Sequence, residues 1–402
     1  RGDTLLGTRR REDPRIAHRY LPDCAPIFGV FGPPRPCGRH TTSTGTRLGS
    51  WLTREGNRMR RLPIFLVLDV SESMVGDELT QMEQAVQNIL STLRTDPYAL
   101  ETAFLSVIVF AGKAKTLVPL KELIQFVPLP LPVGGGTSLG AALDLLMAEI
   151  DRSVVRGSPD KKGDWKPLVF LVTDGRPTDS PSASVARWKR DYRSRANLVA
   201  VSVGGKADHR VLSQLTSDVV VFQNATPDAF AKFAKWVSSS IQTQSRMVDA
   251  GIDDGVDLSK ADPEVVREVM PTEMSETPTD DELILVGRCV RDRHPYVMRF
   301  GRQGKKGVLE RRSNGGFVPV ATMPVSEVYF ELTDAAPGQS ANTGQLESWD
   351  PCPCCGNAHS AAACMCGQIH CLPGPGVFTC PWCGVTTEYG FGAGANVGRG
   401  RG

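Results

Sequence analysis

The sequence predicts an α/β protein whose main domain is a doubly wound, mostly parallel sheet, followed by a small β unit with a cysteine-rich ribbon. Two observations support this prediction. Between residues 61 and 247, long apolar runs alternate with stretches of helical period, as is typical of a parallel sheet covered by helices on both faces. Eight of the eleven cysteines lie between Cys352 and Cys383, so they form one compact group in the sequence.

The strands of the main domain are predicted at five apolar runs: residues 63–69, 104–110, 167–174, 197–204 and 218–222. Their continuous Val, Ile, Leu and Phe residues suit strands that are buried on both faces. Residues 113–120 follow the second run across a short loop that contains Gly112. We expect them to return as the antiparallel arm of a hairpin at the sheet edge.

Helices are predicted where apolar residues recur every three or four positions, at residues 79–93, 138–150, 184–194 and 228–241. The first of these is the clearest, with Leu79, Met82, Val86, Ile89 and Leu93 on one face. Because helical stretches lie between most of the strands, those strands are expected to run parallel to one another.

The domain boundaries are expected where the composition changes. Residues 1–60 are rich in Arg, Pro and Gly and are predicted to be a disordered extension. Since Met59 precedes the first strand, residues 1–58 are expected to lie outside the natural product. The remaining segments are the main domain at 61–247, an acidic linker at 248–282 with a short helix at 262–270, a C-terminal domain at 283–390 and a disordered Gly-rich tail at 391–402. Within the C-terminal domain we expect a β unit at 283–335, with strands in 283–302 and 325–334, and the ribbon at 350–390.

Bulk composition excludes some classes of protein. The 402 residues carry a net charge of +2, with 41% hydrophobic and 22% charged residues, which is ordinary for a soluble globular protein. No apolar run reaches the roughly 18 residues of a membrane-spanning helix, and no apolar core follows the basic N-terminus. Clustered cysteines indicate metal binding in a reducing compartment, so we predict a cytoplasmic location.

Polar side chains lie in three loops of the predicted α/β domain. Asp69, Ser71 and Ser73 come directly after the first strand, and Asp174 ends another. Thr137 follows three glycines at the start of a helix, in a loop that lacks the Lys of a phosphate-binding P-loop. Ligands of open α/β sheets bind beyond the carboxyl ends of the strands, so we expect these five side chains to meet.

These five side chains offer only oxygen ligands, namely two carboxylates and three hydroxyls. Hard divalent cations prefer oxygen, and Mg²⁺ in particular takes few protein ligands while it keeps several waters. With only two formal negative charges facing a dication, a coordination position is left for a carboxylate or phosphate of a protein partner. The sequence therefore predicts a Mg²⁺ site that captures an acidic group.

The same residues resemble the metal-ion-dependent adhesion site of the von Willebrand factor A domain, which uses Asp-x-Ser-x-Ser, a Thr and an Asp from three loops. The resemblance covers about 185 residues and implies a Rossmann-like fold. It also implies that the two serines and the Thr contact the metal, while the acids often act through water. Glu72 stands at a position where family members often have Gly, which leaves the flexibility and affinity of this loop open.

Two Cys-x-x-Cys-Gly knuckles frame the cysteine group, Cys352 with Cys355 and Cys380 with Cys383. Each knuckle places two thiolates and nearby backbone N–H groups around a cation, and two knuckles complete a tetrahedral zinc site. A redox Cys-x-x-Cys pair would normally open a helix in a thioredoxin-like unit, which the sequence does not predict here. We therefore expect a zinc ribbon in which these four thiolates hold a structural Zn²⁺.

Three further cysteines lie between the knuckles: Cys364, Cys366 and Cys371. With His359 or His370 they either hold a second zinc, or they replace one knuckle as ligands of a single site. Cys354 is expected to be a spare. A unit of this size has little core, so bound metal must supply much of its folding free energy.

The order of the domains resembles long forms of the TerY proteins of bacterial tellurite-resistance and stress-response loci. The resemblance runs from Met59 to about Gly390 and includes "LVTDGRPTD" and both knuckles. It implies a C-terminal TerY-C metal-binding domain. Because TerY-like proteins are typically encoded beside a protein kinase and a metal-dependent Ser/Thr phosphatase, it also implies a scaffold or sensor role in a phosphorylation circuit.

The leading functional hypothesis is a non-enzymatic adaptor that binds protein partners through Mg²⁺. The enzymatic alternative is phosphoryl transfer of the haloacid-dehalogenase type, which needs a second acid two residues after its nucleophilic Asp, and position 71 is Ser. Nucleic-acid binding through the zinc unit is the third hypothesis. It is disfavoured because residues 352–384 contain no Lys or Arg to contact phosphate.

Overall fold

The main domain of the computed structural model is a seven-stranded sheet with the strand order β3-β2-β1-β4-β5-β6-β7. The structure describes residues 60–159, 162–203, 207–222, 227–250, 266–268, 282–302, 316–334, 340–390 and 394–398. The expected disordered extension at 1–60 lies outside them except for Arg60. The strands are β1 (Leu62–Asp69), β2 (Ala103–Phe110), β3 (Ala114–Glu122), β4 (Leu168–Thr173), β5 (Asn197–Val203), β6 (Val219–Phe222) and β7 (Val266–Glu268).

The sheet has a parallel centre and two antiparallel edges. Strands β2, β1, β4, β5 and β6 pair in parallel, whereas β3 and β7 pair antiparallel with β2 and β6. This confirms the predicted, mostly parallel sheet and its hairpin arm. Every residue of β1 and β4 is buried, as expected for the centre of a sheet that is covered on both faces. Because β1 and β4 are parallel neighbours, their polar carboxyl ends emerge side by side.

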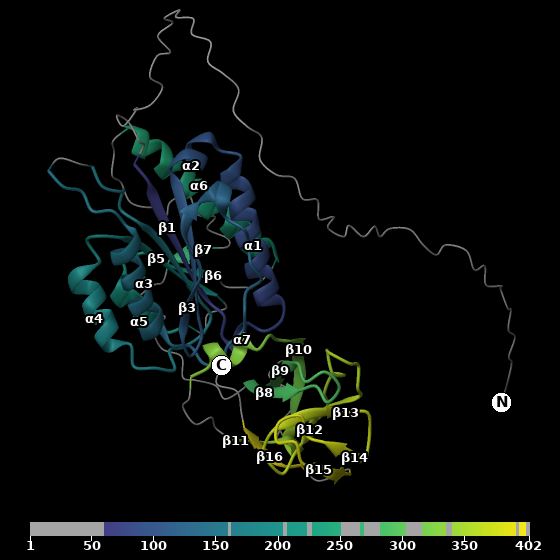
Figure 1. Cartoon of the computed structure of the whole chain (residues 1–402). Coiled ribbons are helices and arrows are strands. Elements are labelled where there is room, and N and C mark those ends of the chain that lie inside the picture. Colours follow the sequence, from purple (N-terminus) through teal and green to yellow (C-terminus); the bar gives the residue numbers. More distant parts are fainter. Residues whose placement is uncertain are drawn as a thin grey trace, which may run out of the picture. The chain divides into compact units, whose positions relative to one another are not determined.

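Helices cover both faces of the sheet (Figure 1). One face packs against α1 (Asp77–Arg94), α2 (Pro97–Thr102) and α6 (Pro227–Ala250), and the other against α3 (Leu139–Ser153), α4 (Ser182–Asp191) and α5 (His209–Leu215). Two short 3₁₀ helices, η1 (Glu72–Met74) and η2 (Leu123–Gln125), lie in loops. Each face has its own buried apolar cluster, which confirms the doubly wound arrangement. Among the described helices, none has the length and apolar character needed to cross a bilayer.

The predicted helix at 262–270 is wrong over residues 266–268, which form β7. This strand pairs antiparallel with β6, so that Val220 lies opposite Glu268 and Phe222 opposite Val266. The edge of β6 would otherwise present unpaired N–H and C=O groups, and β7 satisfies them. Tertiary pairing therefore outweighs the helical pattern of this short segment.

The C-terminal domain is built on a five-stranded sheet with the order β10-β9-β8-β13-β12. Its strands are β8 (Glu282–Arg288), β9 (Pro295–Arg302), β10 (Phe317–Pro324), β12 (His359–Ala363) and β13 (Ile369–Leu372). Strand β13 pairs in parallel with β8, with Ile369 opposite Gly287. The predicted β unit and ribbon are therefore not successive modules, because they share one sheet and one apolar cluster.

Two segments of the C-terminal domain differ from the prediction. Residues 328–332, expected as part of a strand, form the short helix α7 (Val328–Leu332), which places Tyr329 and Leu332 in the buried cluster that also contains α1 and α6. The tail, expected to be disordered, contains β16 (Asn396–Gly398), whose Val397 is buried. Strand β16 pairs with β11 (Ser340–Asn342), and the remaining elements are η5 (Thr343–Gln345), β14 (Gly376–Thr379) and β15 (Thr386–Tyr389).

Candidate metal centres

An oxygen-rich rim lies at the carboxyl ends of β1 and β4. Asp69 is the last residue of β1, and both of its carboxylate oxygens accept hydrogen bonds. The backbone N–H of Ser71 donates to Oδ1 at 2.9 Å, and the Thr173 hydroxyl of β4 donates to Oδ2 at 2.6 Å. The neighbouring strand therefore fixes the orientation of the Asp69 carboxylate.

A chain of hydroxyl and carboxylate oxygens connects the first loop to the third. The Oγ atoms of Ser71 and Ser73 are 3.0 Å apart. The Ser73 hydroxyl donates to Oδ1 of Asp174 at 2.9 Å, although 101 positions separate these residues in the sequence. The structure thus brings Asp69, Ser71, Ser73 and Asp174 together, as the sequence predicted.

The glycine-rich loop brings Thr137 to the same rim. Its amide donates to the Thr178 hydroxyl at 2.9 Å, and the amide of Thr178 donates back to the Thr137 carbonyl at 2.8 Å. A Cβ atom added to Gly175 would lie 3.2 Å from Oγ1 of Thr137, so the Thr137 hydroxyl faces the loop that carries Asp174. All five predicted oxygen donors therefore gather at one edge of the sheet.

Asp179 supports this rim, although no role was predicted for it from the sequence. Its Oδ2 accepts from the Ser138 hydroxyl at 2.6 Å and from the Gly140 amide at 2.8 Å. These contacts satisfy free backbone and side-chain donors at the N-terminus of α3, directly after Thr137. The only sequence signal was an acid a few residues beyond the "TDG" motif, which is too common to predict a contact.

The electrostatics of the rim favour a cation. The five donors are between 0% and 7% exposed, and burial raises the pKa of Asp69 to about 6, although hydrogen bonds from Thr173 and Ser71 oppose that rise. Adjacent oxygens around an octahedral Mg²⁺ lie about 3.0 Å apart when each is about 2.1 Å from the metal. The two oxygen–oxygen separations of 3.0 and 2.9 Å in the Ser71, Ser73 and Asp174 chain fit that spacing.

The cysteines form two clusters, each with four Sγ atoms that all lie within 4.8 Å of one another. The first consists of Cys289, Cys352, Cys355 and Cys371, and the second of Cys364, Cys366, Cys380 and Cys383. The prediction that the four thiolates of both knuckles bind one Zn²⁺ is therefore wrong, because the two knuckles belong to different clusters. The three intervening cysteines divide between the clusters, and Cys354, His359 and His370 belong to neither.

The division has a structural reason. Cys364 and Cys366 lie in the turn between β12 and β13, next to the knuckle Cys380–Cys383. Cys371 lies on β13, which is paired with β8, and this pairing places it beside the turn that follows β8. The β12–β13 hairpin therefore contributes ligands to both clusters, and the ligands of the two clusters alternate in groups along the chain.

Cys289 completes the first cluster and was missed by the sequence analysis. Its turn repeats the backbone pattern of a knuckle: the Cys289 amide donates to the His294 carbonyl, and the Arg293 amide donates to the Cys289 carbonyl. Cys352 and Cys380 make the same two bonds, with Gly356 and Gly384 in place of Arg293. Arg293 has a φ of 63° and so adopts the left-handed conformation that glycine adopts in those knuckles. With one cysteine and no glycine, the sequence of this turn carries no recognisable knuckle.

The thiol geometry fits tetrahedral zinc. Four sulfurs at about 2.3 Å from Zn²⁺ lie about 3.8 Å from one another. The observed Sγ–Sγ distances are 3.6 Å for Cys355–Cys371, 3.8 Å for Cys364–Cys383 and 3.9 Å for Cys366–Cys380. Burial, together with the charge of neighbouring Cys352, raises the pKa of Cys371, so a cation is needed to keep such thiols ionised.

Comparison with known families matches both parts of the chain. The model of the von Willebrand factor type A domain matches residues 64–236. The model of the TerY-C metal binding domain matches residues 280–402. The chain therefore contains a von Willebrand factor type A (vWA) domain and a C-terminal TerY-C metal binding domain. Both resemblances drawn from the sequence motifs are confirmed.

Curated relatives match less than half of this chain. Matrilin-1 from Bos taurus is 27% identical over 172 residues, which are 40% of this chain and 29% of matrilin-1. Matrilin-3 from Homo sapiens is 26% identical over 200 residues, which are 49% of this chain and 37% of matrilin-3. The chain therefore spans about a third of the length of the relatives that it matches.

Solved structures with the same kind of domain give low scores over the whole chain. The von Willebrand factor type A structure from Catenulispora acidiphila has a TM-score of 0.35 and 14% identity, and covers 70% of this chain and 61% of its own. Proximal thread matrix protein 1 from the mussel byssus, solved with a zinc-occupied MIDAS motif, has a TM-score of 0.31 and 17% identity, and covers 57% and 51%. Such scores support no inference about function.

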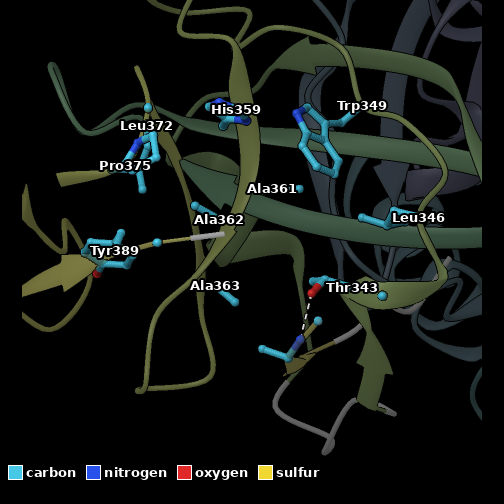
Figure 2. Close-up of a pocket in the computed structure, with 15 residues that line it drawn as sticks. Thr343, Leu346, Trp349, His359, Ala361, Ala362, Ala363, Leu372, Pro375 and Tyr389 are labelled. Atoms are coloured by element: carbon cyan, nitrogen blue, oxygen red, sulfur yellow. Dashed lines mark hydrogen bonds between the residues drawn. The ribbon is translucent and has the colours of Figure 1, made fainter. Parts of the chain in front are cut away.

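The TerY-C domain also contains a pocket of about 540 Å³ (Figure 2). Trp349, His359, Leu372 and Tyr389 are among its walls, and the small residues Ala361–Ala363 of β12 form another part. No Lys, Arg, Asp or Glu lines it.

Proposed function

We propose that this chain is a non-enzymatic adaptor that binds an acidic group of a protein partner through Mg²⁺ at the vWA rim. The observation that carries the proposal is the convergence of five oxygen donors from three loops, with neighbouring oxygens spaced for an octahedral cation. Asp69, Ser71, Ser73, Thr137 and Asp174 would hold the ion. When bound, Mg²⁺ would supply a coordination position at which an oxygen of the partner's carboxylate or phosphate can replace water.

We further propose that both cysteine clusters hold structural Zn²⁺. Each offers four thiols, which fills a tetrahedral shell and leaves no position open for a substrate. The clusters link segments that are distant in the sequence, including the β8–β9 turn and the two knuckles. Zinc at both sites would therefore stabilise the TerY-C domain and fix its shape as an interaction module.

The partner class is proposed from the combination of domains. A vWA domain joined to a TerY-C domain supports a role in a bacterial tellurite-resistance or stress-response phosphorylation circuit, with a protein kinase and a metal-dependent Ser/Thr phosphatase as partners. Two sites that need reduced thiols support a cytoplasmic location. The enzymatic alternative has no support at the rim, because the position that would need an acid is occupied by Ser71, whose hydroxyl contacts Ser73.

Capture of partners from a cell extract tests this proposal. Immobilised wild-type protein is compared with Asp69→Ala and Thr137→Ala in Mg²⁺, and with wild type in chelator. Ser153→Ala is the matched control, because its hydroxyl bonds the Glu149 carbonyl at the far end of α3, about 20 Å from Thr137. We expect the same proteins on wild type and Ser153→Ala, and their loss in both rim variants and in chelator. Undiminished capture in both rim variants and in chelator would contradict metal-mediated binding.

A further inference from the structure

Glu72, which lies between Ser71 and Ser73, is hydrogen-bonded to the TerY-C domain. Glu72 is fully buried, and its Oε1 accepts a hydrogen bond from the Tyr329 hydroxyl of α7, 257 positions further along the chain. Burial and the charge of Glu72 raise the pKa of Tyr329, so this hydroxyl remains a donor at any physiological pH. Glu72, which stands where the adhesion motif often has glycine, therefore has a specific hydrogen-bond partner in this chain.

A second set of contacts connects α7 and Thr333 to the glycine-rich loop that carries Thr137 and to the turn between β2 and β3. The Gly135 amide donates to the Thr333 hydroxyl at 2.9 Å, and the Lys113 amide donates to the Leu332 carbonyl at 2.7 Å. A Cβ atom on Gly135 would lie 2.9 Å from Cγ2 of Thr333 and 3.1 Å from the Tyr329 hydroxyl. The two segments therefore approach so closely that only glycine fits at position 135.

Apolar and ionic contacts reinforce this arrangement. Tyr329 and Leu332 belong to the same buried cluster as Met74 of the first rim loop. Arg299 of β9, only 7% exposed, donates to the Val75 carbonyl at 3.1 Å and pairs with Glu78 and Glu282 at 3.2 Å. The TerY-C domain thus holds both the loop that carries Ser71 and Ser73 and the loop that carries Thr137.

We propose that α7 and Thr333, the clasp (residues 328–333), close the metal rim and oppose the capture of an acidic partner. This inference rests on the proposed function and names the regulation of the same site. The five oxygen donors are at most 7% exposed. The clasp contacts Glu72, which lies between Ser71 and Ser73, and Gly135, two positions before Thr137, so it packs against both loops that carry hydroxyl donors. Clasp closure and partner binding therefore compete, and by linkage any event that opens the clasp raises affinity for the partner.

Two variants are expected to open the clasp without changing the rim donors. Tyr329→Phe removes only the hydroxyl that binds Glu72, and Thr333→Val removes only the hydroxyl that accepts from Gly135. Thr322→Val is the matched control, because its hydroxyl bonds Asp350 within the TerY-C domain at 3.0 Å. All are studied as zinc-loaded full chains, with Mn²⁺ alone as the probe, since Mn²⁺ favours oxygen ligands as Mg²⁺ does.

Hydrogen exchange reports clasp opening at two amides, Gly135 and Lys113, whose acceptors belong to the clasp. We expect Tyr329→Phe to lower the protection of both amides by about tenfold, as befits loss of one buried hydrogen bond to a charged group. Electron paramagnetic resonance measures bound Mn²⁺, and water-proton relaxation measures solvent access to it. We expect relaxation per bound Mn²⁺ to rise in both clasp variants and to stay at the wild-type value in Thr322→Val.

The possible results distinguish a failure of the clasp inference from a failure of the proposed metal site at the rim. If Mn²⁺ binds all four proteins equally, with the same protection and water access, the clasp inference is overturned and the rim proposal stands. An equal rise in water access in Thr322→Val would also overturn the clasp, because the effect would then reflect general loosening. If Mn²⁺ binds none of the four, the proposed function fails, and the clasp inference fails with it.

Discussion

Cys289→Ser is predicted to remove one of two zinc ions from this chain. Cys289 is fully buried, and its Sγ lies within 4.8 Å of the other three thiols of its cluster. Serine has nearly the same shape, but its hydroxyl is a poor zinc ligand and stays protonated at neutral pH. The substitution therefore removes one thiolate and leaves the surrounding packing close to its original state.

The expected loss of stability follows from the share of the folding free energy that bound zinc supplies. Structural zinc sites contribute about 10–16 kcal/mol to folding in small zinc domains. A whole domain is typically stable by only about 5–15 kcal/mol, so a large loss of zinc affinity at one cluster is enough to destabilise the TerY-C domain. Because the first cluster joins the turn after β8 to β13 and to the knuckle Cys352–Cys355, we expect the sheet edge at β13 to become labile to exchange.

The assay is zinc stoichiometry by mass spectrometry after equilibration with a moderate chelator, with hydrogen exchange on the same samples. Wild type is expected to retain two zinc ions per chain and Cys289→Ser one. Cys354→Ser is the matched control, because Cys354 is next to Cys355 yet belongs to neither cluster, and it should retain two. Two ions in Cys289→Ser, or one in Cys354→Ser, would refute the assignment of ligands.

Three further predictions concern the rim and the knuckles. Mn²⁺ affinity should fall about tenfold per pH unit below about pH 6, because the pKa of Asp69 is raised to about 6 and the metal must then displace a proton; titrations that give one affinity from pH 7 to pH 5 would contradict this. Gly175→Ala should lower Mn²⁺ affinity about tenfold, since its methyl group would lie 3.2 Å from Oγ1 of Thr137 and such overpacking costs about 1–3 kcal/mol. Unchanged calorimetric binding would contradict this packing argument. Arg293→Gly should raise the free energy of unfolding by about 0.5–1 kcal/mol, because a φ of 63° suits glycine better than arginine; a lower melting temperature would argue against the knuckle assignment.

The sequence predicted the main sheet and its rim well because both depend on local patterns. Continuous apolar runs identify buried strands, and polar residues at the ends of such strands must gather at one edge whatever the details of packing. Asp69, Ser73 and Asp174 could therefore be placed together without coordinates. Fold topology, more than any single contact, determines that meeting.

The parts that the sequence missed depend on contacts between distant segments. Cys289 becomes a ligand only because β8 pairs with β13, and its own turn carries Arg293 where a knuckle has glycine. Helix α7 has a short apolar alternation that favours a strand, yet a helix lets Tyr329 and Leu332 point into the same buried cluster. Neither the strand partner nor the cluster is visible in the local sequence.

An anomalous difference map tests the central claim most directly. The crystal would be grown from the zinc-loaded full chain in Mn²⁺ and measured above and below the manganese absorption edge, which separates manganese from zinc. The account predicts one manganese peak per chain at the rim, about 2.1 Å from the Ser71 and Ser73 hydroxyls, with zinc at the two cysteine clusters. A map with no manganese at the rim, at Mn²⁺ concentrations that saturate binding in solution, would contradict it.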